Sequence, residues 1–251
     1  MNSRGPWQGM VSIARFNWPF YVAAVVFMIA ALAGLLWSSS FVSKLICAGA
    51  FAAAGYFFFG SLGVSHLIYD HSDLYRWGWL DRVLRGVRLE RAIFCHSGFD
   101  EASQTLRARV PKIEWLILDH YDELRMTEAS IQRARLRYPP TPGTIPAPFD
   151  RWPVAAESAD LVFGLLAIHE LRSEAERGAW FAEARRCLRR DGRVVLVEHV
   201  RDLANFIAFG PGFLHFHSSA SWRRAWESAG LRLRNEFRVT PWVRVFVLTV
   251  P

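Results

Sequence analysis

The chain has 251 residues, enough for one α/β domain with an appended segment, and 52% of them are hydrophobic, which can fill a sizeable core. The net charge of +7 could suggest nucleic acid, but no basic run is interleaved with aromatic residues. We therefore expect no nucleic-acid partner and assign the basic residues to contact with anionic lipid headgroups. Three widely spaced cysteines indicate neither a disulfide framework nor a zinc site.

Residues 1–66 contain two uncharged runs separated by Lys44. Each reaches the length of about 20 residues that crosses a bilayer core, which predicts a hairpin of two transmembrane helices over about 18–37 and 41–63. A cleaved signal peptide is the alternative, but no small-residue cleavage site is evident and a second run follows directly. Because arginines flank the pair on its outer sides, both termini are expected in the cytoplasm, with the hairpin in the inner (cytoplasmic) membrane.

Residues 67–90 connect this segment to the rest of the chain. Trp77, Leu80, Leu84 and Val87 share one face of a possible helix, and tryptophan commonly settles at headgroup level. Two interpretations stay open: an interfacial helix lying on the inner leaflet, or a linker helix packed on the domain.

From residue 91 onward, strand-like and helix-like segments alternate, which is typical of a mostly parallel sheet with helices on both faces. Strands are predicted over 92–96, 113–119, 159–168 and 194–200, with a closing antiparallel pair joined at Thr240 and Pro241. Helices are predicted over 100–110, 127–137, 173–188 and 221–229, the third of them starting with a capping box of Ser173 and Glu176. The proline-rich stretch 138–153 should contain at most one short strand.

Residues 158–200 combine an apolar strand ending near His169, a capped helix, an LRRDG turn and a strand ending at Glu198. Their sequence is SADLVFGLLAIHELRSEAERGAWFAEARRCLRRDGRVVLVEHV. In this order it resembles the second half of class I S-adenosylmethionine-dependent methyltransferases of the ubiquinone/menaquinone-biosynthesis type. A weaker resemblance extends over about 91–250. It implies a Rossmann-like domain over 91–251 with a mostly parallel seven-stranded sheet, and S-adenosylmethionine as cofactor.

The resemblance places the cofactor beside the turn HSGFDE, which follows the first strand. The family usually has two or three glycines there, which let backbone amides approach the cofactor, whereas this chain has only Gly98. Asp119 ends the second strand and is expected to bind the ribose hydroxyls, with Asp122 as the alternative. No acidic residue clearly matches the one that reads the adenine amino group. The residues implied to bind the cofactor are His96, Ser97, Gly98, Asp119, Asp122 and Ala167.

Methyl transfer requires mainly an in-line approach in a dry pocket, and a hydroxyl acceptor also benefits from a histidine base. His169 and His199 end neighbouring strands at the sheet edge where ligands bind, so we predict these two histidines and Glu198 as catalytic residues. A structural role for each histidine is the alternative. A metal site is not expected, because the spacings match no strong ligand pattern. The predicted substrate-binding residues are Arg201, Asn205, His215 and His217.

The loop RDLANFIAFGPGFLHF, residues 201–216, is either a substrate lid facing the membrane or a hydrophobic loop packed on the sheet. The leading hypothesis is a membrane-anchored methyltransferase acting on a hydrophobic, membrane-resident small molecule or lipid. The alternative is a non-catalytic, membrane-tethered binding or scaffold protein of the same fold, which the single glycine would suit.

Overall fold

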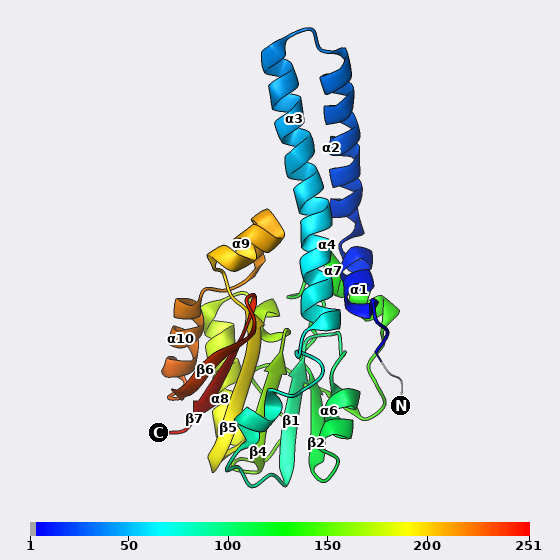
Figure 1. Ribbon diagram of the computed structural model, residues 1–251. Coiled ribbons are helices and arrows are strands. Elements are labelled where there is room, and N and C mark those ends of the chain that lie inside the picture. Colours follow the sequence, from blue (N-terminus) through cyan, green and yellow to red (C-terminus); the bar gives the residue numbers. More distant parts are fainter. Residues whose placement is uncertain (1–3) are drawn as a thin grey trace.

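The computed structural model describes residues 4–251. Seven strands form one sheet in the order β3-β2-β1-β4-β5-β7-β6, in which only β7 runs antiparallel to its neighbours (Figure 1). This confirms the predicted Rossmann-like, mostly parallel seven-stranded sheet. The strands are β1 (Arg91–His96), β2 (Glu114–Asp119), β3 (Thr144–Pro146), β4 (Ala159–Leu165), β5 (Leu188–His199), β6 (Arg232–Thr240) and β7 (Val243–Thr249).

Four helices of the domain correspond to the four predicted ones, with boundaries that differ by up to three residues. They are α6 (Ser103–Arg109), α7 (Ala129–Arg137), α8 (Glu174–Cys187) and α10 (Ser219–Ser228). The capping box of α8 is present, whereas α6 starts later than expected because Asp100 accepts the backbone N–H groups of Ala102 and Ser103 before the helix begins. Strand β4 ends at Leu165, since the next residues form the 3-10 turn η3 (Ile168–Glu170).

The central strands are buried on both faces, as their continuous apolar sequence predicts. One face packs against Trp180 of α8 and against Trp222 and Trp226 of α10. The other face is covered by the segment that follows the N-terminal helices, including the short α5 (Leu80–Leu84).

The burial of its tryptophans in the domain supports the linker interpretation of residues 67–90 over an interfacial helix. Trp77 and Trp79 are buried rather than exposed to a membrane surface. The Trp79 ring stacks on Phe163 of β4, with 6.0 Å between ring centroids, and its Nε1–H donates to the Leu74 carbonyl. Burial of these rings stabilises the join between the sheet and the N-terminal segment.

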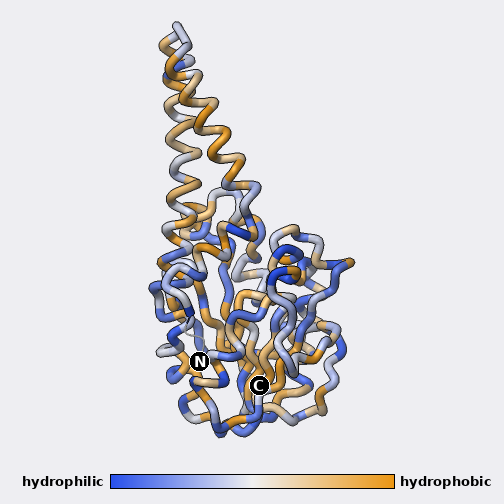
Figure 2. The backbone as a smooth tube through the Cα atoms, turned by 90° about the vertical axis from the view of Figure 1, so that its right-hand side faces the viewer, coloured by the Kyte–Doolittle hydropathy of each residue, from blue (hydrophilic) through white to orange (hydrophobic). Residues whose placement is uncertain are grey.

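The N-terminal segment projects from the domain as two helical arms (Figure 1). The first arm is α2 (Trp18–Trp37). The second is a continuous helical stretch, Phe41–His71, made of α3 (Phe41–Gly55), η1 (Tyr56–Gly60), α4 (Ser61–His66) and η2 (Leu67–His71). Figure 2 shows apolar residues along both arms, and each is long and apolar enough to cross a membrane by those two criteria. The second helix extends past residue 63 because Ser65 and Ile68 are buried at the join with the domain.

A short helix, α1 (Gln8–Phe16), ties the start of the chain to the end of the second arm. The Asp70 carboxylate accepts the backbone N–H groups of Gly9 and Met10 at 2.7 and 3.0 Å. Gly9 lies so close to Tyr69 that a Cβ atom at position 9 would be 2.2 Å from the Tyr69 Cβ. The arms are thus fixed to the domain by close backbone packing and by a charge-assisted contact.

Candidate active site

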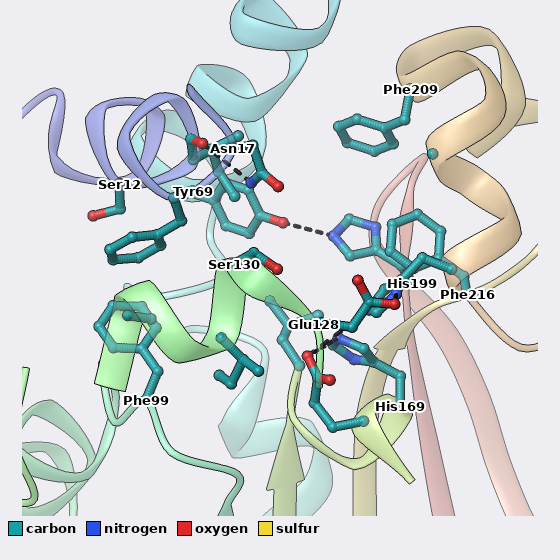
Figure 3. A pocket seen from close by; sticks show the side chains of 18 of the residues that line it. Ser12, Asn17, Tyr69, Phe99, Glu128, Ser130, His169, His199, Phe209 and Phe216 are labelled. Carbon is teal, nitrogen blue, oxygen red and sulfur yellow. Dashed lines mark hydrogen bonds and ion pairs between the residues drawn. The ribbon is translucent and has the colours of Figure 1, made fainter. Parts of the chain in front are cut away.

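A cavity of about 680 Å³ lies between the carboxyl edge of the sheet and the base of the helical arms (Figure 3). Its walls are mainly apolar, with a few polar side chains, which is typical of a small-molecule site. Lining residues include Phe94, Leu165, His169 and His199 from the sheet edge, Phe16, Phe20, Tyr21 and Phe57 from α1 and the arms, and Phe209, Leu214 and Phe216 from α9 (Leu203–Phe209), η4 (Gly210–His215) and the residue after it.

The 201–216 loop forms one wall of this cavity through α9 and η4. The Tyr56 hydroxyl of the second arm donates to the Ile207 carbonyl of α9 at 2.8 Å, so this loop contacts the arms directly. Arg201 stabilises the loop, because its guanidinium donates to the carbonyls of Leu214 and Phe216 at 2.7 and 2.8 Å. The sequence predicted Arg201 as a substrate ligand, but it does not line the cavity.

Glu198 fixes the turn that carries His169. Its side chain is fully buried; Oε1 accepts the backbone N–H groups of Ala167, Ile168 and His169 at 2.9 to 3.2 Å, and Oε2 lies 2.7 Å from the His169 Nδ1. With Nδ1–H donating to Glu198, the Nε2 atom of His169 lies 3.6 Å from Glu170 Oε1 at the cavity wall. Burial acts to lower the pKa of His169, but the charge and hydrogen bond of Glu198 outweigh it, and the pKa is raised.

His199 also borders the cavity, but both of its ring nitrogens have partners. The Tyr69 hydroxyl lies 2.9 Å from Nε2, and the Nδ1 atom contacts the Asn205 Oδ1 and the Trp242 carbonyl at 3.1 and 3.0 Å. Its ring stacks on Phe216, and burial lowers the pKa of His199 to about 4. The structure therefore gives His199 no free nitrogen with which to accept a proton from an acceptor, contrary to the sequence prediction.

Two further predicted substrate residues are buried supports of the site. Asn205 is fully buried, and it binds His199 and the Trp242 carbonyl. His217 lies 3.0 Å from Arg177 and 3.1 Å from the His169 carbonyl, and burial lowers the pKa of His217 to about 3. Of the four residues predicted to bind substrate, only His215 lines the cavity.

The residues predicted to bind the cofactor lie beside the cavity, and none of the six lines it. Gly98 has φ +90°, a conformation that favours glycine, and a Cβ atom there would be 2.7 Å from the Tyr121 ring. Asp119 is almost fully buried: Oδ1 accepts the N–H groups of Gly98 and Tyr121 at 2.9 and 3.1 Å, and Oδ2 pairs with Arg135. Both carboxylate oxygens of Asp119 are thus occupied by protein groups in this arrangement.

Two more of the residues predicted to bind the cofactor, Asp122 and Ala167, have local structural roles. Asp122 accepts the Leu124 N–H at 3.0 Å and pairs with Arg125 at 3.3 Å, which makes it a loop cap. Ala167 is buried in the turn held by Glu198. The sequence did not identify Glu170, because nothing in its own neighbourhood marks it as a cavity residue; it follows His169 in the η3 turn.

Comparison with known proteins supports the methyltransferase part of the sequence resemblance. Residues 117–196 match a family model described as a methyltransferase domain. No curated protein matches the sequence. Among solved structures, the fold is similar to the PH0226 protein of Pyrococcus horikoshii OT3, with 13% identity, a TM-score of 0.50, and 70% of this chain and 90% of that chain covered. It is also similar to the mitomycin 7-O-methyltransferase MmcR, with 11% identity, a TM-score of 0.55, and 98% and 73% covered.

Residues 117–196 match a methyltransferase domain, and the strand order and the two similar structures show the fold of class I methyltransferases. The protein is an S-adenosylmethionine-dependent methyltransferase, and S-adenosylmethionine is its cofactor. The catalytic interpretation therefore holds over the scaffold interpretation.

The turn after β1 offers free polar groups for the methionine end of this cofactor, but the Asp119 carboxylate expected to bind the ribose is occupied. Both ring nitrogens of His96 and the Ser97 hydroxyl are buried without hydrogen-bond partners, although His96 Nδ1 lies 3.4 Å from Asp119. Such groups suit a polar ligand, and the following residues Phe99 and Ala102 border the cavity. The ribose end fits only when Arg135 leaves Asp119, since both carboxylate oxygens are otherwise taken.

Proposed function

We propose that this protein is a methyltransferase anchored in the inner (cytoplasmic) membrane by its N-terminal hairpin, and that it methylates a hydrophobic small molecule or lipid resident in that membrane. The observation that carries the proposal is the composition of the cavity wall. One side is the carboxyl edge of a methyltransferase sheet, and the other is the base of two apolar helices. A membrane-resident acceptor could pass between the bilayer and the sheet edge along such a wall.

The exposed surface of the arms favours a membrane over burial in a soluble core. In the most apolar stretch of each arm, only 17% of the first and 6% of the second is buried. Large side chains such as Phe20, Phe27 and Trp37 are exposed. Apolar patches of this extent are rare on soluble monomers. The arginines before the first arm and after the second favour a cytoplasmic domain, because basic residues are concentrated on that side.

In the proposed reaction, His96, Ser97 and Gly98 would hold the methionine end of the cofactor, and Asp119 would bind the ribose if its pair with Arg135 opened. S-adenosylmethionine supplies an electrophilic methyl group on its sulfonium. The aromatic side chains Phe209 and Phe216 exclude water from the acceptor.

For a hydroxyl acceptor, the Nε2 atom of His169 accepts the proton while Glu198 holds Nδ1–H and stabilises the resulting imidazolium. His169 is favoured over His199 for this role because its Nε2 makes no hydrogen bond within the described residues.

The test uses the full chain in membranes, supplied with methyl-labelled S-adenosylmethionine and the extracted membrane lipids. Label should enter the organic phase in an apolar product. Ser130→Trp should raise the KM for the acceptor and leave cofactor affinity unchanged, because Ser130 lines the cavity. Leu136→Trp, on the same helix but 86% exposed, is the matched control. Label confined to water-soluble products would refute a membrane-resident acceptor.

Topology is tested separately. A cysteine at position 44, in a Cys47→Ser background, should react with an impermeant thiol reagent added to intact cells, while a tag at the C-terminus should stay protected. A tag accessible from outside would overturn the proposed orientation.

A further inference from the structure

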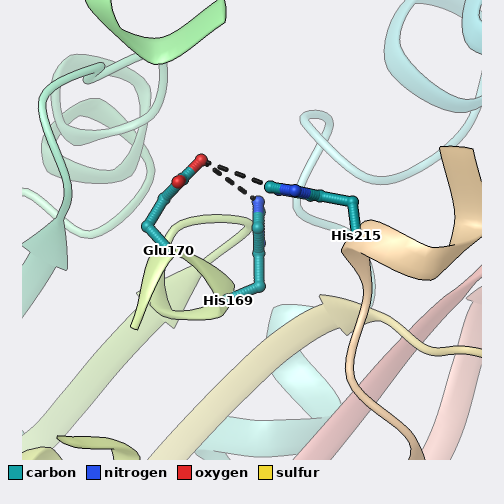
Figure 4. A group of neighbouring side chains, drawn as sticks. All are labelled: His169, Glu170 and His215. Carbon is teal, nitrogen blue, oxygen red and sulfur yellow. Dashed lines mark ion pairs between the residues drawn. The ribbon is translucent and has the colours of Figure 1, made fainter. Parts of the chain in front are cut away.

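The structure brings together three side chains that the sequence keeps apart. His169 and Glu170 belong to the η3 turn, and His215 ends η4 on the opposite wall (Figure 4). One ligand atom from each lies within 4.8 Å of the other two. Glu170 Oε1 is 3.6 Å from the His169 Nε2 and 3.8 Å from the His215 Nε2. All three residues line the cavity.

These distances between ligand atoms are close to those found around a bound metal ion. Ligand atoms about 2.0–2.1 Å from a tetrahedral Zn²⁺ lie about 3.4 Å from one another. The two distances from Glu170 therefore need to shorten by only a few tenths of an ångström. The rotation of the His215 side chain, which is 26% exposed, can bring the two histidines together.

Two further observations point to a ligand at this place. Glu170 is only 8% exposed, and its second oxygen, Oε2, is buried without any hydrogen-bond partner. A buried carboxylate with an unpartnered oxygen is costly unless a cation or a donor satisfies it. In addition, Glu198 binds the Nδ1–H of His169, which is the arrangement that orients metal-bound histidines through their other nitrogen.

We propose that His169, Glu170 and His215 form a binding site for a divalent transition metal ion of the Zn²⁺ type. Two imidazoles and one carboxylate leave one or more coordination positions free, and these face the cavity. The metal site stands independently of the acceptor. Its role rests on the proposed function: an acceptor hydroxyl bound at the free position loses its proton to solvent more readily, because the metal stabilises the oxyanion. In that state His169 is a metal ligand and not the base, since both roles use the same Nε2 lone pair.

The experiment uses the purified full chain in detergent, stripped with a chelator and then titrated with Zn²⁺ by calorimetry. Metal analysis should give one Zn²⁺ per chain, and Co²⁺ in its place should give visible d–d absorption. Glu170→Gln and His215→Ala should each lose at least about 100-fold in affinity, and Glu198→Gln about 10- to 100-fold because it removes only the orienting partner. His71→Ala and Glu227→Gln, which change the same residue types outside the cluster, should bind as the wild type does.

Tryptophan fluorescence and S-adenosylmethionine affinity show whether each variant is folded. Absence of Zn²⁺ binding by the wild type, or equal binding by folded Glu170→Gln and His215→Ala variants, overturns the metal site. Metal binding that is lost in these variants supports the site even when no lipid is methylated. If the wild type methylates lipid but binds no Zn²⁺, the metal site is refuted and the proposed function is retained.

Discussion

Replacing Glu198 tests how the η3 turn positions His169. The carboxylate accepts three backbone N–H groups and the His169 Nδ1–H, all in a fully buried setting. Glu198→Ala leaves these donors without an acceptor and should cost about 3–5 kcal/mol of unfolding free energy, the range for removing one partner of a buried charged pair. Glu198→Gln keeps one oxygen for the backbone N–H groups, so the expected cost is about 1.5–3 kcal/mol.

The glutamine variant also changes the chemistry of His169. Its amide N–H₂ cannot accept from Nδ1–H, so the imidazole should place its proton on Nε2 and lose the lone pair that faces the cavity. In the metal-free protein, where His169 is the base, turnover should fall by about 100-fold to 10,000-fold with cofactor affinity nearly unchanged, the usual scale for a lost general base.

Urea unfolding followed by tryptophan fluorescence measures the stability of these variants, and the ¹⁵N shifts of the His169 ring report its tautomer. Glu227→Gln, an exposed change, is the control and should stay within about 0.5 kcal/mol of the wild type. Unfolding of Glu198→Ala at the wild-type urea concentration would contradict this role of Glu198, as would a Glu198→Gln variant that keeps the Nδ1–H tautomer and full turnover.

Three further predictions concern the turn after β1 and its surroundings. Arg135→Gln should tighten S-adenosylmethionine binding in calorimetry because it frees an oxygen of Asp119, and weaker binding would show that Arg135 supports the site. Gly98→Ala should cost about 1–3 kcal/mol in urea unfolding, since its φ is +90° and its Cβ would meet the Tyr121 ring; an unchanged midpoint would contradict this strain. Burial lowers the pKa of His120 to about 4, so the unfolded state takes up a proton first and stability should fall as the pH drops from about 6.5 to 4. The loss attributable to His120 is about 3 kcal/mol, and His120→Asn should remove this part of the pH dependence.

The sequence predicted the fold well because its signals were local and periodic. Continuous apolar strands, the Ser173 capping box and the closing antiparallel pair all follow from neighbouring residues, and each is present in the structure. The linker was harder to interpret, because Trp77 and Trp79 suit a membrane surface as well as a protein interior. Only the tertiary structure shows them packed against β4.

The site was predicted in part. His169 and His199 border the same cavity, since parallel strands meet at one edge, although β4 ends at Leu165 and His169 lies in the η3 turn. Their different hydrogen bonds depend on Tyr69 and Trp242, which no spacing connects to them. Likewise, Asp119 of β2 pairs with Arg135 of α7, and no sequence spacing predicts this ion pair. Position along the chain marks where a residue lies, but not which partner it binds.

The packing of Gly9 on Tyr69, with Asp70 binding the first turn of α1, has a consequence for selectivity among acceptors. If the arms span a bilayer as proposed, this attachment would hold the reaction centre at one height above the bilayer midplane. In the proposed membrane setting, an acceptor is then methylated where its reactive atom reaches that height. Tail length matters little, while the distance from headgroup to nucleophile decides which atom reacts. In that proposed setting, the arms would select the acceptor atom by its distance from the bilayer midplane.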